Sequence, residues 1–119
     1  MIKGINDSFE NISEFVKMFE KDPPTAVFFA NDLMAIGAYE AADKYNIKIP
    51  DDISIIGHDG IIYSELVNPR LTTMVQPKKK LGEIAAGLLI NIISGKVNDP
   101  EDVILSAKLI KRQSTSELI

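Results

Sequence analysis

Two pairs of polar residues, Asn31-Asp32 and His58-Asp59, each directly follow a short apolar run of the chain. An asparagine amide offers one acceptor and two donors, whereas an ionised aspartate only accepts hydrogen bonds. Together these groups suit a small ligand with several hydroxyl or amide groups, and Asp59 can accept from two hydroxyls at once. Gln76, after a third strand-like run, is placed to supply another amide at the same rim.

Each of these polar residues also has a purely structural interpretation, which their spacing leaves open. Asn31 or Asp32 can cap the helix that follows by accepting a hydrogen bond from one of its first backbone N–H groups. Asp59 precedes Gly60, a pair that is ordinary in turns. A shared ligand site and a set of caps and turns are therefore both compatible with the pattern.

The remaining reactive residues do not indicate a metal or catalytic centre. His58 is the single histidine and the chain has no cysteine, so we expect His58 to pack beside the rim and predict no metal and no cofactor. No serine is placed as an evident nucleophile, and no catalytic residue is assigned. The run Lys78-Lys79-Lys80 is best explained as the solvated start of a helix, and no glycine-rich phosphate-binding motif supports a nucleotide site.

The elements that would position these residues alternate between helix and strand. Apolar spacings of three and four residues predict four helices, at 8–21, 32–45, 61–67 and 78–94. Short apolar runs predict strands at 25–30, 53–57 and 71–76, with candidate edge strands at 103–105 and 108–112. We expect Asn46 and Gly95 to end the second and last helices, and the tail from Gln113 to be frayed.

This alternation predicts a parallel α/β sheet with helices on both faces. Ligands of such sheets bind outside the carboxyl ends of the strands, where Asn31 and Asp59 fall. The composition agrees with one small domain, because 119 residues with 45% hydrophobic and 25% charged side chains can form a single core. The net charge of -4 argues against direct DNA contact, and neither a membrane-spanning run nor a secretory signal is visible.

Three stretches together resemble the lactose/galactose repressor family. They read PTAVFFANDLMAIGAYEAADKYNIKIPDDISIIGHD at 24–59, NPRLTTMVQPKKKLGEIAAGLLINIISG at 68–95 and LIKRQST at 109–115. The phrases ANDxMAxGA, IPDDISIIG and PxLTTxxQP, in this order and spacing, are highly specific. The resemblance covers nearly the whole chain from Pro24 and is looser before it.

The resemblance implies a partial effector-binding domain over 1–119, with the three-layer α/β fold of periplasmic sugar-binding proteins. It implies that residues 77–95 form a crossover helix of the amino-terminal lobe, and that a separate helix-turn-helix domain, which this chain lacks, binds DNA. Asn31 and Asp59 match positions that bind the effector, Gln76 matches a further pocket residue, and Asn6 or Ile5 falls near another. The effector would be a sugar or a purine, and the protein would be a cytoplasmic repressor that does not contact membranes.

The resemblance also implies a homodimer, which would use Ile36 on the second helix together with Tyr63, Leu66 and Val67. With the first lobe absent, the crossover helix would expose an apolar stripe, so we expect the chain itself to self-associate. The sequence departs from the family at His58, where an aromatic is usual, and at Gly60, where aspartate is frequent. Two alternatives are a sugar-binding protein of a transport system and an enzyme that uses Asp59; no second carboxylate or histidine partner supports the latter.

Overall fold

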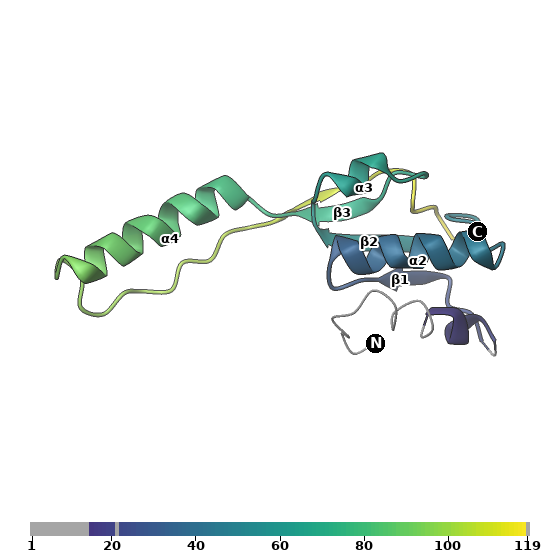
Figure 1. The fold of residues 1–119 in the computed structure, drawn as a ribbon, viewed down its shortest axis with the longest axis horizontal. Coiled ribbons are helices and arrows are strands. Elements are labelled where there is room, and N and C mark those ends of the chain that lie inside the picture. The colour runs from purple at the N-terminus through teal and green to yellow at the C-terminus, as the bar shows by residue number, and fades with distance from the viewer. Residues whose placement is uncertain (1–14, 21, 119) are drawn as a thin grey trace. The chain divides into compact units, whose positions relative to one another are not determined.

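The computed structural model describes residues 15–20 and 22–118, which form two compact units. The first unit ends at Val75 and resumes at Leu109, and the second covers Gln76–Lys108. After a helical turn at 15–19, the elements are β1 (Ala26–Phe28), α2 (Asp32–Lys44), β2 (Ser54–Asp59), α3 (Tyr63–Leu66), β3 (Thr72–Val75), α4 (Lys78–Ile93) and β4 (Lys108–Ile110) (Figure 1).

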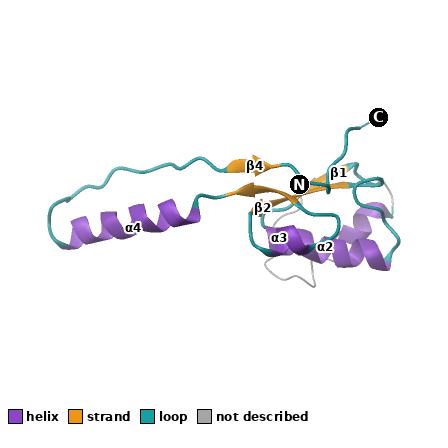
Figure 2. Ribbon diagram, turned by 90° about the horizontal axis from the view of Figure 1, so that it is seen from above, coloured by secondary structure: helices purple, strands orange, loops and turns teal. Residues whose placement is uncertain are grey.

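The strands form one sheet in the order β1-β2-β3-β4, and β1, β2 and β3 are parallel. Ala26 pairs with Ser54 at one end, and Asp59 pairs with Val75 at the other. Helices α2 and α3 lie on the same side of the sheet (Figure 2). This arrangement follows from right-handed crossovers between strands that are added in one direction. The sequence-based prediction of a parallel α/β sheet is confirmed. The predicted cover of helices on both faces is not seen among the described residues, because α2 and α3 share one face.

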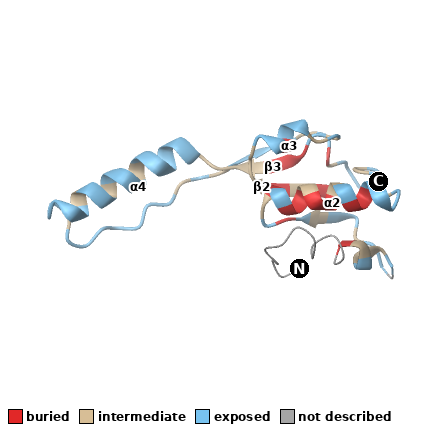
Figure 3. Ribbon diagram, in the orientation of Figure 1, coloured by how far each residue is buried: buried red, intermediate tan, exposed pale blue. Residues whose placement is uncertain are grey.

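The core of the first unit lies between α2 and the sheet. The inner face of α2 carries small residues, among them Ala35, Ala38 and Ala41, none of which is more than 1% exposed. Small side chains let the helix backbone approach the strands closely, and Ile53 and Ile55 fill the space from the sheet side. Figure 3 shows this buried face along α2.

The boundaries of α2 agree with the sequence signals. Tyr45 follows its last turn, and Asn46 adopts a left-handed backbone with φ 55°. Asparagine is one of the few residues that tolerate this conformation, which is why it serves as a helix stop. Gly95, with φ 72°, plays the same part after α4. Residues 8–14 of the first predicted helix lie outside the described residues.

The tail after β4 is ordered, so the prediction that it frays from Gln113 is wrong. Ser114 is fully buried between β2 and β3. Its backbone oxygen accepts from the Ile55 N–H at 2.8 Å, and its hydroxyl accepts from the Thr72 N–H at 2.8 Å and donates to the Ile55 carbonyl at 2.6 Å. These bonds satisfy backbone groups that the two diverging strands would otherwise leave unpaired.

Arg112 ties the same tail to α3. Its guanidinium donates to the Ser64 hydroxyl at 3.1 Å, to the Leu71 carbonyl at 2.7 Å and to Glu65 Oε1 at 3.0 Å. A guanidinium suits this position because it presents several donors in a rigid plane. The polar tail, for which the sequence predicted disorder, therefore connects β2, β3 and α3 through its hydrogen bonds.

The second unit consists of α4 and the segment that returns from it. The stripe Leu81, Ile84, Leu88 and Ile92 lines a shallow groove of about 310 Å³, which Val103 and Leu105 line from the other side. The prediction of a strand at 103–105 is wrong. Val103 and Leu105 face this groove, Ile104 between them is exposed, and the segment joins no sheet ladder among the described residues.

We predict that a Tyr39→Phe chain becomes more stable relative to the wild type as the pH rises. The Tyr39 hydroxyl is buried and has no hydrogen-bond partner among the described residues. Burial raises the pKa of this phenol to about 12 from its usual 10.0, a rise that nearby Ser114 partly offsets. The folded chain thus holds the Tyr39 proton more tightly than the unfolded chain. The protonated phenol therefore contributes fully to the stability of the wild type below pH 10, and this stability is lost as the pH approaches 12.

Urea unfolding of both chains at pH 7 and at several values above 10 checks this prediction. At pH 7 the variant should match or slightly exceed the wild type, because it removes an unsatisfied buried hydroxyl. A difference between the chains that stays constant from pH 7 to 12 would show that the phenol does not titrate as its burial requires.

Candidate effector site at the carboxyl ends of β1 and β2

Asn31 directly precedes α2 and lies three residues after the end of β1. Its backbone is extended, with φ -150°, and its side-chain oxygen accepts from the Met34 N–H at 2.8 Å. The capping interpretation is therefore correct for Asn31. Because the cap uses only the oxygen, the two donors of the amide group remain chemically suited to a ligand.

Asp59 ends β2 in an unusual backbone conformation. Its φ is 108°, a value that side chains with a Cβ rarely adopt, and Gly60 follows with φ 65°. Successive residues of a regular strand point to opposite faces of the sheet. Here the Asp59 carboxyl lies beside its neighbour, with Oδ1 at 3.1 Å from His58 Nδ1. The turn thus re-aims Asp59, whose side chain is 35% exposed.

His58 packs beside the rim, as the sequence-based interpretation held. Its ring lies edge-on to Phe28 of β1, with the ring centroids 6.5 Å apart. The side chain is one-third exposed and touches Asp59 through Nδ1. No group of three or more metal-ligating side chains occurs in the described part of the chain.

The register of the sheet brings Asn31 and Asp59 to the same edge. Phe28 pairs with Ile56, and Asn31 and Asp59 each come three residues later in their segments. Adjacent parallel strands end on the same side, so both residues leave the sheet at one rim. Asp32 does not join them there, because it is fully buried below the rim.

Two other residues of the expected site, Gln76 and Asn6, stay predictions. Gln76 is half-buried and follows Val75, the partner of Asp59 in the sheet, but it belongs to the second compact unit. Asn6 and its neighbour Ile5 lie outside the described residues. Lys79 is exposed and lies 3.9 Å from Glu83, which fits the solvated helix start expected for the lysine run.

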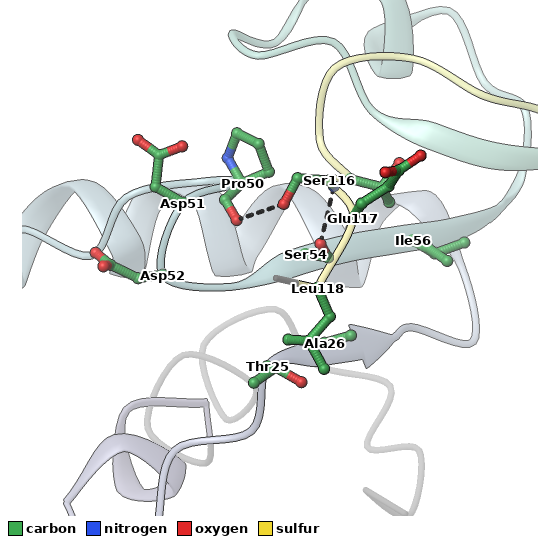
Figure 4. A pocket seen from close by; sticks show the side chains of 11 residues that line it. Thr25, Ala26, Pro50, Asp51, Asp52, Ser54, Ile56, Ser116, Glu117 and Leu118 are labelled. Carbon is green, nitrogen blue, oxygen red and sulfur yellow. Dashed lines mark hydrogen bonds between the residues drawn. The ribbon is translucent and has the colours of Figure 1, made fainter.

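A cavity of about 580 Å³ occupies the opposite end of the sheet. Thr25, Ser54 and Glu117 are among its lining residues (Figure 4). The Ser116 hydroxyl donates to the Pro50 carbonyl and the Ser116 N–H donates to the Ser54 hydroxyl, so local contacts already use these polar groups (Figure 4). Because this cavity lies at the amino ends of the strands, it does not coincide with the rim where a ligand of a parallel sheet is expected.

Comparison with known proteins identifies the family. A family model described as a periplasmic binding protein-like domain matches residues 4–115. The chain belongs to this family. Its relatives include the HTH-type transcriptional repressor PurR of Yersinia enterocolitica, 42% identical over 98 residues, which are 82% of this chain and 29% of the repressor.

Solved structures agree with the periplasmic binding protein-like assignment. A LacI family transcriptional regulator from Enterococcus faecalis V583 with bound ribose aligns with 98% of this chain and over 43% of the regulator's chain, with TM-score 0.89 and 34% identity. A LacI family regulator from Arthrobacter in complex with lactose matches 93% and 42%, with TM-score 0.80 and 29% identity. This chain therefore spans less than half the length of these relatives.

These matches confirm the resemblance to the effector-binding domain of lactose/galactose repressors. The relatives named above are transcriptional regulators. None of the helices among the described residues is long and apolar enough to cross a membrane.

Proposed function

We propose that this chain is part of the effector-binding domain of a transcriptional repressor, and that it binds a small polyhydroxylated ligand of the sugar or purine class. The observation that carries the proposal is the pair Asn31 and Asp59 at one rim of the sheet. Asp59 accepts hydrogen bonds from ligand hydroxyls, and the Asn31 amide donates to a neighbouring ligand oxygen. Sugar-bound regulators of the same fold support this assignment.

We further propose that a helix-turn-helix segment elsewhere in the protein makes all DNA contacts, and that effector binding changes its affinity for DNA. The acidic net charge of this chain, -4, supports the proposal that this part of the protein does not contact DNA. The same open reading frame should also supply the second wall of the effector cleft. Gln76 and Asn6 of this chain would contribute to the cleft together with Asn31 and Asp59.

Expression of the complete open reading frame that contains this chain tests the proposal. We expect ribose, lactose, cellobiose or a purine base to raise the melting temperature of that protein, since a ligand that binds only the folded state stabilises it. The same compound should change retention of the protein on DNA. A reading frame without a helix-turn-helix segment, or DNA retention that no effector alters, would contradict the regulator assignment.

We propose that α4 is the crossover helix of the other lobe, within residues 77–95. No residue of α4 is buried, and Leu89, Ile90 and Ile93 are each more than half exposed. A helix with apolar residues over most of its surface requires neighbours. The compact unit Gln76–Lys108, to which α4 belongs, is consistent with a separate lobe.

The isolated 119-residue chain is expected to self-associate through this unpartnered helix. Replacing Leu89 with lysine should shift the chain toward monomer at micromolar concentration in light scattering, because the charge cannot be buried without a partner. Asp51→Lys, at an exposed residue of the first compact unit, is the control. A wild-type chain that is monomeric at these concentrations would refute the expectation.

The repressor is proposed to dimerise through α3 and the neighbouring face of α2. Tyr63 and Leu66 of α3 are 56% and 70% exposed, and Val67, which follows α3, is half-buried. Ile36 is half-buried on α2, which contacts α3. Exposed apolar side chains on contacting elements form the kind of patch that dimers cover. Leu66→Lys in the complete protein should yield monomers in light scattering, while Leu89→Lys should leave that dimer intact.

A further inference from the structure

Asp32 is a buried acidic residue for which effector binding provides no direct role. It follows Asn31 at the start of α2, yet its side chain is fully buried rather than at the rim. An aspartate is seldom buried without specific partners, because removing its polar atoms from water costs free energy that hydrogen bonds must offset. Its partners therefore indicate what it does.

Those partners come from two other segments. Asp32 Oδ1 accepts from the Thr73 hydroxyl of β3 at 2.6 Å, and Oδ2 accepts from the Ile61 N–H at 2.8 Å. Thr73 is itself fully buried. A single carboxyl group thus connects the start of α2, the middle of β3 and the turn that follows β2.

The turn that Asp32 holds is the one that carries Asp59. Ile61 is two residues after Asp59, and the residues at 59 and 60 both have positive φ, 108° and 65°. A residue with a Cβ keeps such a conformation only when the surrounding structure imposes it. The hydrogen bond from Ile61 fixes the far end of this strained turn.

Asp32 also lies directly against the backbone of β2. A Cβ added at Gly57 would overlap Asp32 Oδ1 and would lie 2.9 Å from Leu71 Cδ2. Only glycine at this position lets the carboxyl group reach beneath the strand. The absence of a side chain at Gly57, the buried acid and the strained turn therefore form one arrangement.

We propose that Asp32 is a positioning residue of the effector site. Through the Ile61 N–H and with support from Thr73, it holds Asp59 in the left-handed conformation that re-aims its carboxyl at the rim. The inference rests on the proposed function, because Asp59 is the proposed effector-binding acid. Asp32 itself does not contact the effector.

Nuclear magnetic resonance of the 119-residue chain without any ligand tests this inference. The three-bond coupling between the amide and α protons of Asp59 reports its φ, and amide exchange reports the Ile61 hydrogen bond. Thr73→Val removes the hydroxyl donor with little change in shape, whereas Thr73→Ser retains it. Ile53→Val, at a fully buried site before the other end of β2, is a control for general destabilisation.

In Thr73→Val we expect the Asp59 coupling to move toward that of an extended residue, and exchange at Ile61 to accelerate by about tenfold. Thr73→Ser should restore both values, and Ile53→Val should leave the Asp59 coupling unchanged. If Thr73→Val does not fold, Thr73→Ala serves the same purpose, because alanine also lacks the hydroxyl that donates to Asp32. An unchanged Asp59 coupling in the folded variant would overturn the inference.

This outcome is separable from the fate of the proposed function. The coupling and exchange are measured without effector, so they report the positioning alone. If the Asp59 coupling and the Ile61 exchange change as expected while Asp59→Asn in the complete protein leaves effector affinity intact, the positioning role of Asp32 stands and the assignment of Asp59 to the effector fails. If the coupling and the exchange do not change, the positioning role of Asp32 fails, whatever Asp59 binds.

Discussion

A Gly57→Ala chain is expected to lose about 3 kcal/mol of unfolding free energy, enough to lower its urea midpoint severely. The added methyl group would overlap Asp32 Oδ1 and approach Leu71 Cδ2 to 2.9 Å. Asp32 and Leu71 are both fully buried, so neither side chain can turn toward solvent. Urea unfolding followed by circular dichroism measures the loss.

The reason for this large effect is that two penalties add. Overpacking a tight interior costs about 1–3 kcal/mol, and displacing the carboxyl group would leave the Thr73 hydroxyl and the Ile61 N–H without their acceptor. Gly82→Ala is the matched control, because a Cβ at Gly82 in α4 meets nothing within 4 Å. That variant should be unchanged or gain up to about 1 kcal/mol from helix propensity. Equal midpoints for Gly57→Ala and the wild type would contradict the close packing beneath β2.

Asp59→Asn in the complete protein is expected to weaken effector binding by about 10- to 100-fold. Hydrogen bonds to a charged acceptor contribute about 1.5–3 kcal/mol, and the amide keeps only one of the two acceptor oxygens. Asparagine tolerates positive φ better than most residues, so the variant should retain the turn and fold normally. Calorimetric titration with the sugar or purine that most stabilises the wild type gives the change in Kd.

Asp51→Asn is the control for this substitution. It makes the same chemical change at an exposed residue beside the cavity at the amino ends of the strands. Effector affinity should be unaffected there. Weaker binding in Asp51→Asn together with wild-type affinity in Asp59→Asn would move the site to the opposite end of the sheet.

The helices and parallel strands could be predicted from the sequence because their signals are local. The apolar stripes of α2 and α4, Asn46 at a left-handed stop and the short apolar strands each follow from residues within one segment. The prediction of a strand at 103–105 was wrong because a short apolar run occurs both in strands and in segments that pack on a helix. The order of the tail could not be predicted because the hydrogen-bond partners of Ser114 are distant in sequence. They are Thr72 and Ile55, which lie 42 and 59 positions earlier.

The candidate site was predictable in part for the same reason. The rule for parallel sheets is sufficient to select Asn31 and Asp59. The role of Asp32 was not predictable, since Ile61 and Thr73 lie 29 and 41 residues away. Nor does the sequence disclose that Asp59 has positive φ, because the pattern Asp-Gly is equally consistent with relaxed turns.

A map of effector contacts by isotope-edited nuclear magnetic resonance tests most directly whether the effector binds at the rim that carries Asn31 and Asp59. The complete protein is titrated with the compound that gives the largest thermal shift. We expect the Asn31 side-chain amide and the backbone amides of Asp59 and Gly60 to show the largest perturbations within this chain. Perturbations confined to Thr25, Ser54 and Ser116, with Asn31 and Asp59 unmoved, would contradict it.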